Sequence, residues 1–175
     1  EYPDMRDPDE RYWASVELYS ATGDETYAKY LRSILDQYVK DGYGWADVSS
    51  YGNKAYLGMD KSKQEEKYVK LISEHLKNRA QELTGFIDSD GYMCDLGEDY
   101  IWGSNMDVLN RARMILDSVA VNGGDKNKAY QQLSYLLGAN TLSQSYVTGY
   151  GTVRTEHPHH RVAIVKQYAL PGMVA

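Results

Sequence analysis

The stretch "VLNRARMILDSVAVNGGDKNKAYQQLSYLLG", residues 108–138, contains two helical patterns separated by a stop signal. On both sides of the stop, apolar residues recur every three or four positions, as on one face of an amphipathic helix. Gly123 and Gly124 suit the left-handed end of a helix, and Asp125 suits the cap of the next one. The stretch therefore predicts an antiparallel helix pair joined by a short turn.

The same punctuation occurs twice more. "ATGDETY" places Gly23 and Asp24 between two helical patterns, and "GMDKSKQEEKY" places Gly58 and Asp60 in the same way. The sequence thus predicts three αα-hairpins, at about 8–40, 50–84 and 103–138, with ordered loop over 139–175. No convincing strand alternation appears, so the fold class is all-α, as a bundle, a solenoid or an α/α toroid.

Composition narrows the class of function. A chain of 175 residues suits one domain. The net charge of −6, without any long basic run, argues against a nucleic-acid partner. No apolar run approaches the roughly 20 residues of a membrane helix, so no membrane partner is expected. The 17 tyrosines and 3 tryptophans against one phenylalanine suit helices with wet edges, and also surfaces that meet sugars.

"HPHHR", residues 157–161, is the densest cluster of chemistry. A zinc site would need three or four converging ligands, but these imidazoles are close in sequence and Pro158 stiffens the turn between them. His and Arg side chains can also hold loop carbonyls in a purely structural role. In the third interpretation, the planar donors of Arg161 and the ring nitrogens of His159 bind a polar ligand. The residues alone leave these alternatives open.

Two tryptophans lie in or beside predicted loops. Trp102, in "YIWGSN", precedes a helix that Ser104 or Asn105 can cap, and Trp45 lies in "GYGWAD". Each ring suits a core plug, and each also suits a stacking platform for a sugar.

"DPDER", residues 7–11, places carboxylates at the start of the first predicted helix. They can stabilise the positive end of the helix dipole. They can also contribute to a calcium site, since calcium prefers oxygen ligands.

Four motifs occur in a fixed order: "DERYWASVELYSATGD" from Asp9, "WGSNMDVLNRA" from Trp102, "YLLGANTLSQSYVTGYG" from Tyr135, and "HPHHR" followed by "LPGMVA". This set resembles glycoside hydrolase family 9, the inverting cellulases, over essentially the whole chain. The resemblance implies that residues 1–175 are part of a family 9 catalytic domain, an (α/α)6 barrel of twelve helices. The three hairpins would supply about half of that barrel.

The resemblance also implies a mechanism. The family's catalytic base aspartate lies upstream, in a "D-A-G-D"-type motif, and its general acid glutamate lies downstream of "P-G-M"; neither motif occurs here. Inverting hydrolysis needs two carboxyl groups roughly 6.5–9.5 Å apart. The implied parent is a secreted endo-β-1,4-glucanase that cleaves internal bonds of cellulose. This chain alone is expected to be inactive, with the remainder of the catalytic domain as its partner.

The resemblance also assigns substrate-binding roles to individual residues of this sequence. His159 and Arg161 resemble residues that hydrogen-bond glucosyl hydroxyls beside the cleavage point, with His160 in support. Trp102 and Trp45 resemble aromatic platforms for the β-1,4-glucan.

Asp9 and Glu10 resemble a pair that helps to hold a structural calcium in several family members, although their neighbours differ here. Two other interpretations remain beside the cellulase: a non-catalytic α/α carbohydrate-binding or structural module, and an unrelated α/α-toroid enzyme. The ordered motifs disfavour the last, because a shared fold alone does not produce them.

Overall fold

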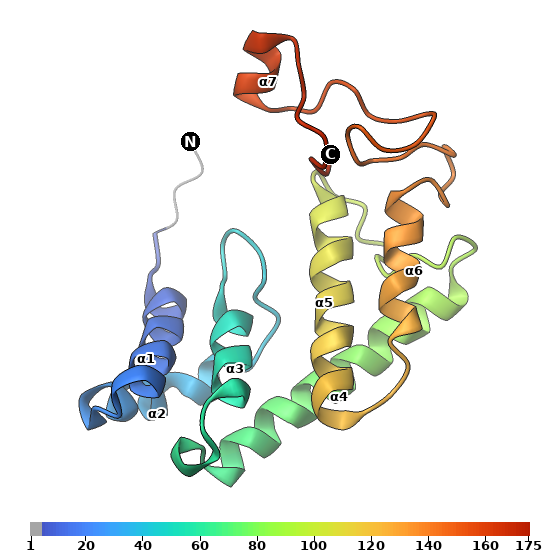
Figure 1. Cartoon of the computed structure of the whole chain (residues 1–175). Helices are drawn as coiled ribbons and strands as arrows, with labels where there is room; N and C mark the ends of the chain where they lie inside the picture. The colour runs from blue at the N-terminus through green and yellow to red at the C-terminus, as the bar shows by residue number, and fades with distance from the viewer. Residues whose placement is uncertain (1–4) are drawn as a thin grey trace. The chain divides into compact units, whose positions relative to one another are not determined.

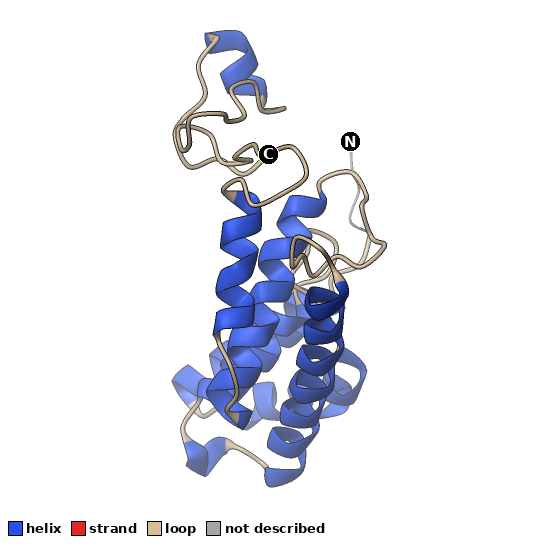
Figure 2. Ribbon diagram, turned by 90° about the vertical axis from the view of Figure 1, so that its right-hand side faces the viewer, coloured by secondary structure: helices blue, strands red, loops and turns tan. Residues whose placement is uncertain are grey.

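The computed structural model describes residues 5–175, and its regular elements there are all helices (Figures 1 and 2). They are α1 (Pro8–Thr22), α2 (Glu25–Tyr38), α3 (Ser49–Gly58), α4 (Glu66–Ser89), α5 (Ser104–Asn122), α6 (Asn127–Leu136) and α7 (Arg161–Lys166), with a 3-10 turn at Lys61–Lys63. None of the described helices is long and apolar enough to cross a membrane. The chain forms two compact units that divide within α4, after Asn78.

In the first unit, α1 and α2 form the first predicted hairpin. Gly23 adopts a left-handed φ of 71°, and its N–H donates to the Tyr19 carbonyl at 2.9 Å. The Asp24 side chain then caps α2 by accepting from the Thr26 N–H at 2.8 Å. The turn chemistry predicted from the sequence is confirmed.

Helix α3 lies closest to α1 rather than to α4, which differs from the predicted second hairpin. Gly52 permits this close approach of α3 to α1, because a Cβ there would lie 2.6 Å from a ring carbon of Tyr12. Hydrogen bonds also join these helices. The Tyr12 hydroxyl donates to Asn53 Oδ1 at 2.9 Å, and Asn53 Nδ2 donates to the Tyr38 carbonyl at 2.9 Å. Side chains of α4 still join the same core, which contains Tyr12, Val16, Leu31, Leu35, Tyr56, Tyr68 and Ile72.

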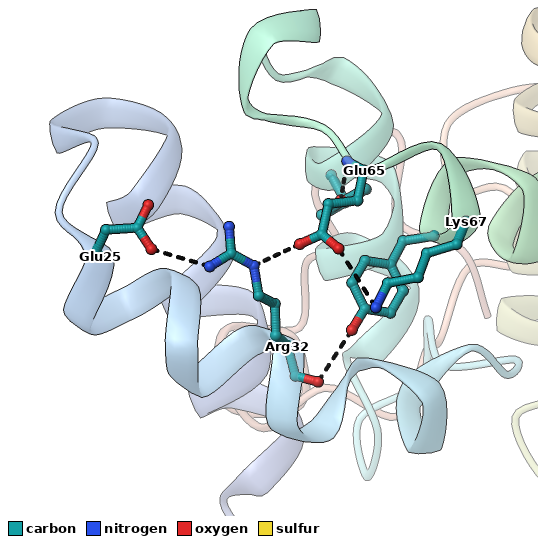
Figure 3. Close-up of polar contacts among 6 residues, drawn as sticks. Glu25, Arg32, Glu65 and Lys67 are labelled. Carbon is teal, nitrogen blue, oxygen red and sulfur yellow. Dashed lines mark hydrogen bonds and ion pairs between the residues drawn. The ribbon is translucent and has the colours of Figure 1, made fainter.

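A polar network fastens α2 to the start of α4 (Figure 3). Arg32 lies between two carboxylates, with its Nε 2.5 Å from Glu65 Oε1 and its Nη1 3.0 Å from Glu25 Oε2. Lys67 Nζ lies 3.4 Å from the other oxygen of Glu65, and the Tyr68 hydroxyl donates to the Arg32 carbonyl at 3.2 Å. Hydrogen bonds to Glu25 and Glu65 raise the pKa of Arg32. The network is partly exposed, so it sets the geometry more than it adds stability.

In the second unit, α5 and α6 form the third predicted hairpin. The Gly123 N–H donates to the Val119 carbonyl at 3.0 Å, and Asp125 accepts from the Asn127 N–H at 2.8 Å. The cap of α5 was predicted wrongly, because Gly103, with a φ of 78°, holds that position and no side chain caps the helix. The core of this unit contains Cys94, Leu96, Val108, Tyr135 and Leu136.

Residues 139–175 lie beyond the end of this hairpin where α5 begins and α6 ends (Figure 1). They are mainly loop, as predicted, but include the six-residue α7, which was not predicted. Thr148 ties the segment together: its N–H donates to the Met173 carbonyl at 2.9 Å, and its carbonyl accepts from Gly172 at 2.7 Å. Asn105 Nδ2, in the first turn of α5, donates to the Ala175 carbonyl at 2.5 Å. The C-terminal segment is therefore fastened to the start of α5.

Candidate functional site

The "HPHHR" segment borders a surface depression of about 300 Å³ in the second unit. Pro158 is buried beneath the segment, whereas the three histidines and Arg161 are exposed. The polar residues that line the depression include Glu156, His157, His159, Gln167 and Tyr168. Helix α7 adds Ala163 and Ile164 to the lining. The structure thus brings His157 and His159 into the depression, while His160 and Arg161 do not line it.

His160 has a structural task in addition to the supporting role expected of it. Its Nδ1 accepts a hydrogen bond from the Ala163 N–H at 3.2 Å and so caps α7. Its carbonyl accepts from the Ile164 N–H at 2.9 Å, which starts the helix. Only Nε2 of this imidazole is left for a ligand.

Arg161 is the first residue of α7 and is exposed. Within residues 5–175, no hydrogen bond or ion pair engages its guanidinium, nor the imidazole of His159. Both side chains therefore keep their donors available for a polar ligand, which favours the ligand-binding interpretation of the segment.

The metal interpretation of "HPHHR" lacks support. In the part of the chain that the structure describes, no three His, Cys, Asp or Glu groups come together in an arrangement that holds a metal ion. The segment is too short to fold three imidazoles onto one point, and the cap at His160 occupies one ring nitrogen.

Both tryptophans lie at the surface. Trp102 is 82% exposed and Trp45 is 63% exposed, so neither is a core plug. Trp102 precedes the left-handed Gly103 at the start of α5, the end to which Asn105 fastens the C-terminal segment. Trp45 lies in the loop between α2 and α3 in the first unit. Exposed indole rings can stack against the C–H face of a sugar.

The loop that carries Trp45 is closed by charged groups. Lys40 pairs with Asp47 Oδ2, and Asp47 Oδ1 accepts from the Ser49 N–H at 2.9 Å and hydroxyl at 2.5 Å. Partial burial alone would raise the pKa of Asp47, but Lys40 and Ser49 outweigh it and hold that pKa below its usual value. The Val48 N–H donates to Asp9 Oδ2 at 2.8 Å. The loop is thus held from both sides.

Asp9 and Glu10, the expected calcium pair, lie in the first turn of α1. Asp9 is only 4% exposed, and one of its oxygens already accepts the Val48 amide, whereas Glu10 is exposed. Calcium takes six to eight oxygen ligands, and no third acidic group joins these two in a metal-binding cluster among the described residues. Calcium at Asp9 and Glu10 stays a prediction of the family resemblance, and backbone carbonyls or water would have to supply the other ligands.

Residues 1–175 match the family model described as Glycosyl hydrolase family 9. The chain belongs to this family. A curated relative, Endoglucanase C from Cellulomonas fimi, is 30% identical over 169 residues, which cover 91% of this chain and 15% of that protein. The chain therefore spans well under two thirds of the relative's length.

Solved family 9 structures match the fold. AaCel9A, determined in complex with cellobiose-like isofagomine, superimposes with a TM-score of 0.86 at 34% identity, over 99% of this chain and 34% of that one. A Zn-binding triple mutant of the family 9 endoglucanase J30 gives 0.88 at 28% identity, over 99% and 33%. The expected fold class, αα-hairpins that form part of an (α/α)6 barrel, is confirmed.

Three polar residues that line the depression in this family 9 chain were not singled out from the sequence: Glu156, Gln167 and Tyr168. Gln167 ends α7 in a left-handed conformation, with a φ of 53°, which is rare outside glycine and gave no sequence signal. Glu156 directly precedes "HPHHR", and this position next to the histidines was the one sequence signal that could have identified it. Tyr168 reaches the depression only because α7 forms.

Proposed function

We propose that the whole protein is an endo-β-1,4-glucanase that hydrolyses internal bonds of cellulose with inversion, and that these residues supply part of its glucan-binding surface. The observation that carries the proposal is the family 9 match over residues 1–175. The name of the Cellulomonas fimi relative and the sugar-like ligand of AaCel9A support the substrate class.

The assigned roles follow from chemistry and exposure. The free donors of His159 and Arg161 hydrogen-bond glucosyl hydroxyls, while His160 holds α7 and thereby the position of Arg161. The exposed rings of Trp102 and Trp45 stack against pyranose faces. The acid and base carboxyl groups of inverting hydrolysis come from the remainder of the catalytic domain.

The proposal keeps a structural calcium at Asp9 and Glu10 as what the family resemblance implies, with further oxygen ligands from backbone carbonyls or water. It places the whole protein outside the cell, since cellulose is an insoluble polymer that cells cannot take up intact. The partners are cellulose or cello-oligosaccharides and the remainder of the catalytic domain.

Reducing-sugar release from carboxymethylcellulose tests the proposal. The whole protein should release sugar, and the 175-residue chain, checked for helix content by circular dichroism, should release none. Substantial turnover by the chain alone would show that the carboxyl groups lie within it. A whole protein that binds glucan without cleaving it would favour the non-catalytic α/α module.

A further inference from the structure

The ring of Trp102 is placed by the backbone that carries it. The residue is 82% exposed, so packing around the ring itself contributes little. The backbone on both sides is tied into successive turns: the Ile101 N–H donates to the Asp99 carbonyl at 2.9 Å, and the Ile101 carbonyl accepts from the Ser104 N–H at 3.1 Å. A group that holds Asp99 therefore also sets where the indole lies.

Arg111, on α5, holds this segment with a largely buried guanidinium. Its Nη1 donates to two backbone carbonyls, that of Asp95 at 2.9 Å and that of Leu96 at 3.0 Å. Its Nη2 pairs with Asp99 Oδ2 at 2.6 Å. The side chain of Arg111 is 14% exposed, against 64% for that of Asp99. Arginine offers several donors in one rigid plane, so this single side chain fixes three acceptors at once.

These contacts close the turn that leads to Trp102. The Leu96 carbonyl accepts from the Asp99 N–H at 3.0 Å as well as from Arg111, so the guanidinium joins the first and last residues of the turn. We propose that Arg111 is a positioning residue that holds residues 95–101 so that the Trp102 ring is presented to the glucan, a role that rests on the proposed function of Trp102 as a platform. Arg111 acts through the loop and not by contact with the sugar.

The other half of the loop has a separate clamp. Gln132, fully buried on α6, accepts from the Asp95 N–H at 3.0 Å through Oε1 and donates to the Met93 carbonyl at 2.8 Å through Nε2. Asp99 lies outside this clamp, and its side chain is mostly exposed. Loss of the Asp99 carboxylate should therefore loosen the approach to Trp102 without unfolding the unit.

Steady-state hydrolysis of cellohexaose by the whole protein tests the proposal. Asp99→Ala removes one acceptor of Arg111 and should raise KM by about fivefold, with kcat within about twofold of wild type, because stacking holds the substrate and the transition state alike. Arg111→Met should raise KM further, since all three contacts are lost. Glu98→Ala is the control: it removes the neighbouring exposed carboxylate, which is not among the acceptors of Arg111, and should leave both constants near wild type.

A double-mutant cycle separates positioning from a general structural role. Trp102→Ala should itself raise KM. In that background, neither Asp99→Ala nor Arg111→Met should raise KM further, because the ring that they displace is absent. A general structural role would instead leave their effects in place, added to that of Trp102→Ala.

Two results would overturn the positioning role and leave the proposed function intact. One is an Asp99→Ala enzyme whose KM matches that of Glu98→Ala. The other is an effect of Asp99→Ala or Arg111→Met on KM that persists in full without the Trp102 ring. A wild-type protein that does not cleave cellohexaose, or a Trp102→Ala enzyme with unchanged KM, would contradict the proposed function of this surface and the positioning role with it.

Discussion

Asp95 shows how one buried carboxyl group can govern the response to pH. It is fully buried, and neither of its oxygens has a hydrogen-bond partner among the described residues. Burial raises its pKa to about 7, against the opposing charge of Arg111. Its backbone is well held, because its N–H donates to Gln132 Oε1 at 3.0 Å and its carbonyl accepts from Arg111 Nη1 at 2.9 Å. The residue is fixed in a place where its charge is unfavourable.

The folded state therefore binds the Asp95 proton more tightly than the unfolded state does. The associated stability is fully present below about pH 4 and is lost as the pH rises toward 7, by up to about 4 kcal/mol. Asp95→Asn should remove this loss of stability. The free energy of unfolding, measured with denaturant, should therefore be higher relative to the wild type at pH 8 than at pH 4. Asp36→Asn, at an exposed carboxylate of α2, is the control. Parallel pH curves for Asp95→Asn and the wild type would contradict the account.

For single residues, the sequence indicated which side chains could have a role, but not whether they are buried or exposed. Trp102 and Trp45 were singled out as candidates from the sequence, but only the structure shows that they are exposed. The burial of Asp95 was not predictable, because it depends on Gln132, 37 positions away. The cap made by His160 was also unexpected, since histidine is not among the residues that usually cap helices.

Among the elements, local chemistry explains which were predicted. The Gly-Asp turns at residues 23–24 and 124–125 were predicted because glycine endings and aspartate caps act within a few residues. Helix α7 was missed because it has six residues and no Ser, Thr, Asp or Asn cap. The close partner of α3 was missed because the approach of two helices at a small residue leaves no periodic signal.

Gly52 makes the contact between α1 and α3 testable. Gly52→Ala should destabilise the protein by about 1–3 kcal/mol, because the added methyl group meets the buried ring of Tyr12. Gly58→Ala, on the same helix, meets nothing within 4 Å and should be neutral or slightly stabilising. Chemical denaturation of both variants measures the difference. Equal effects of the two substitutions would show that the contact does not matter.

At the scale of the whole molecule, the order of motifs predicted the family and the fold class, because order along the chain is a property of the entire sequence. The shape of the depression beside His159 was not predictable. It depends on α7 and on the hydrogen bonds between Thr148 and residues 172–173 that hold the C-terminal segment. The chain spans about a third of the solved family 9 structures that it matches, at 34% and 33% of their lengths. In the proposed function, this chain contributes glucan-binding residues, and the remainder of the catalytic domain supplies the groups that transfer protons.

The most direct test of this division is the hydrolysis of carboxymethylcellulose by the whole protein with Arg161→Ala. The account predicts that kcat/KM falls at least tenfold, about 1.4 kcal/mol or more, with an unchanged melting curve, because a charge-assisted contact to the sugar is lost. Lys166→Ala, which removes an exposed cation from the same helix, should leave kcat/KM near wild type. An Arg161→Ala enzyme with full activity, or one that instead releases a bound metal, would contradict it.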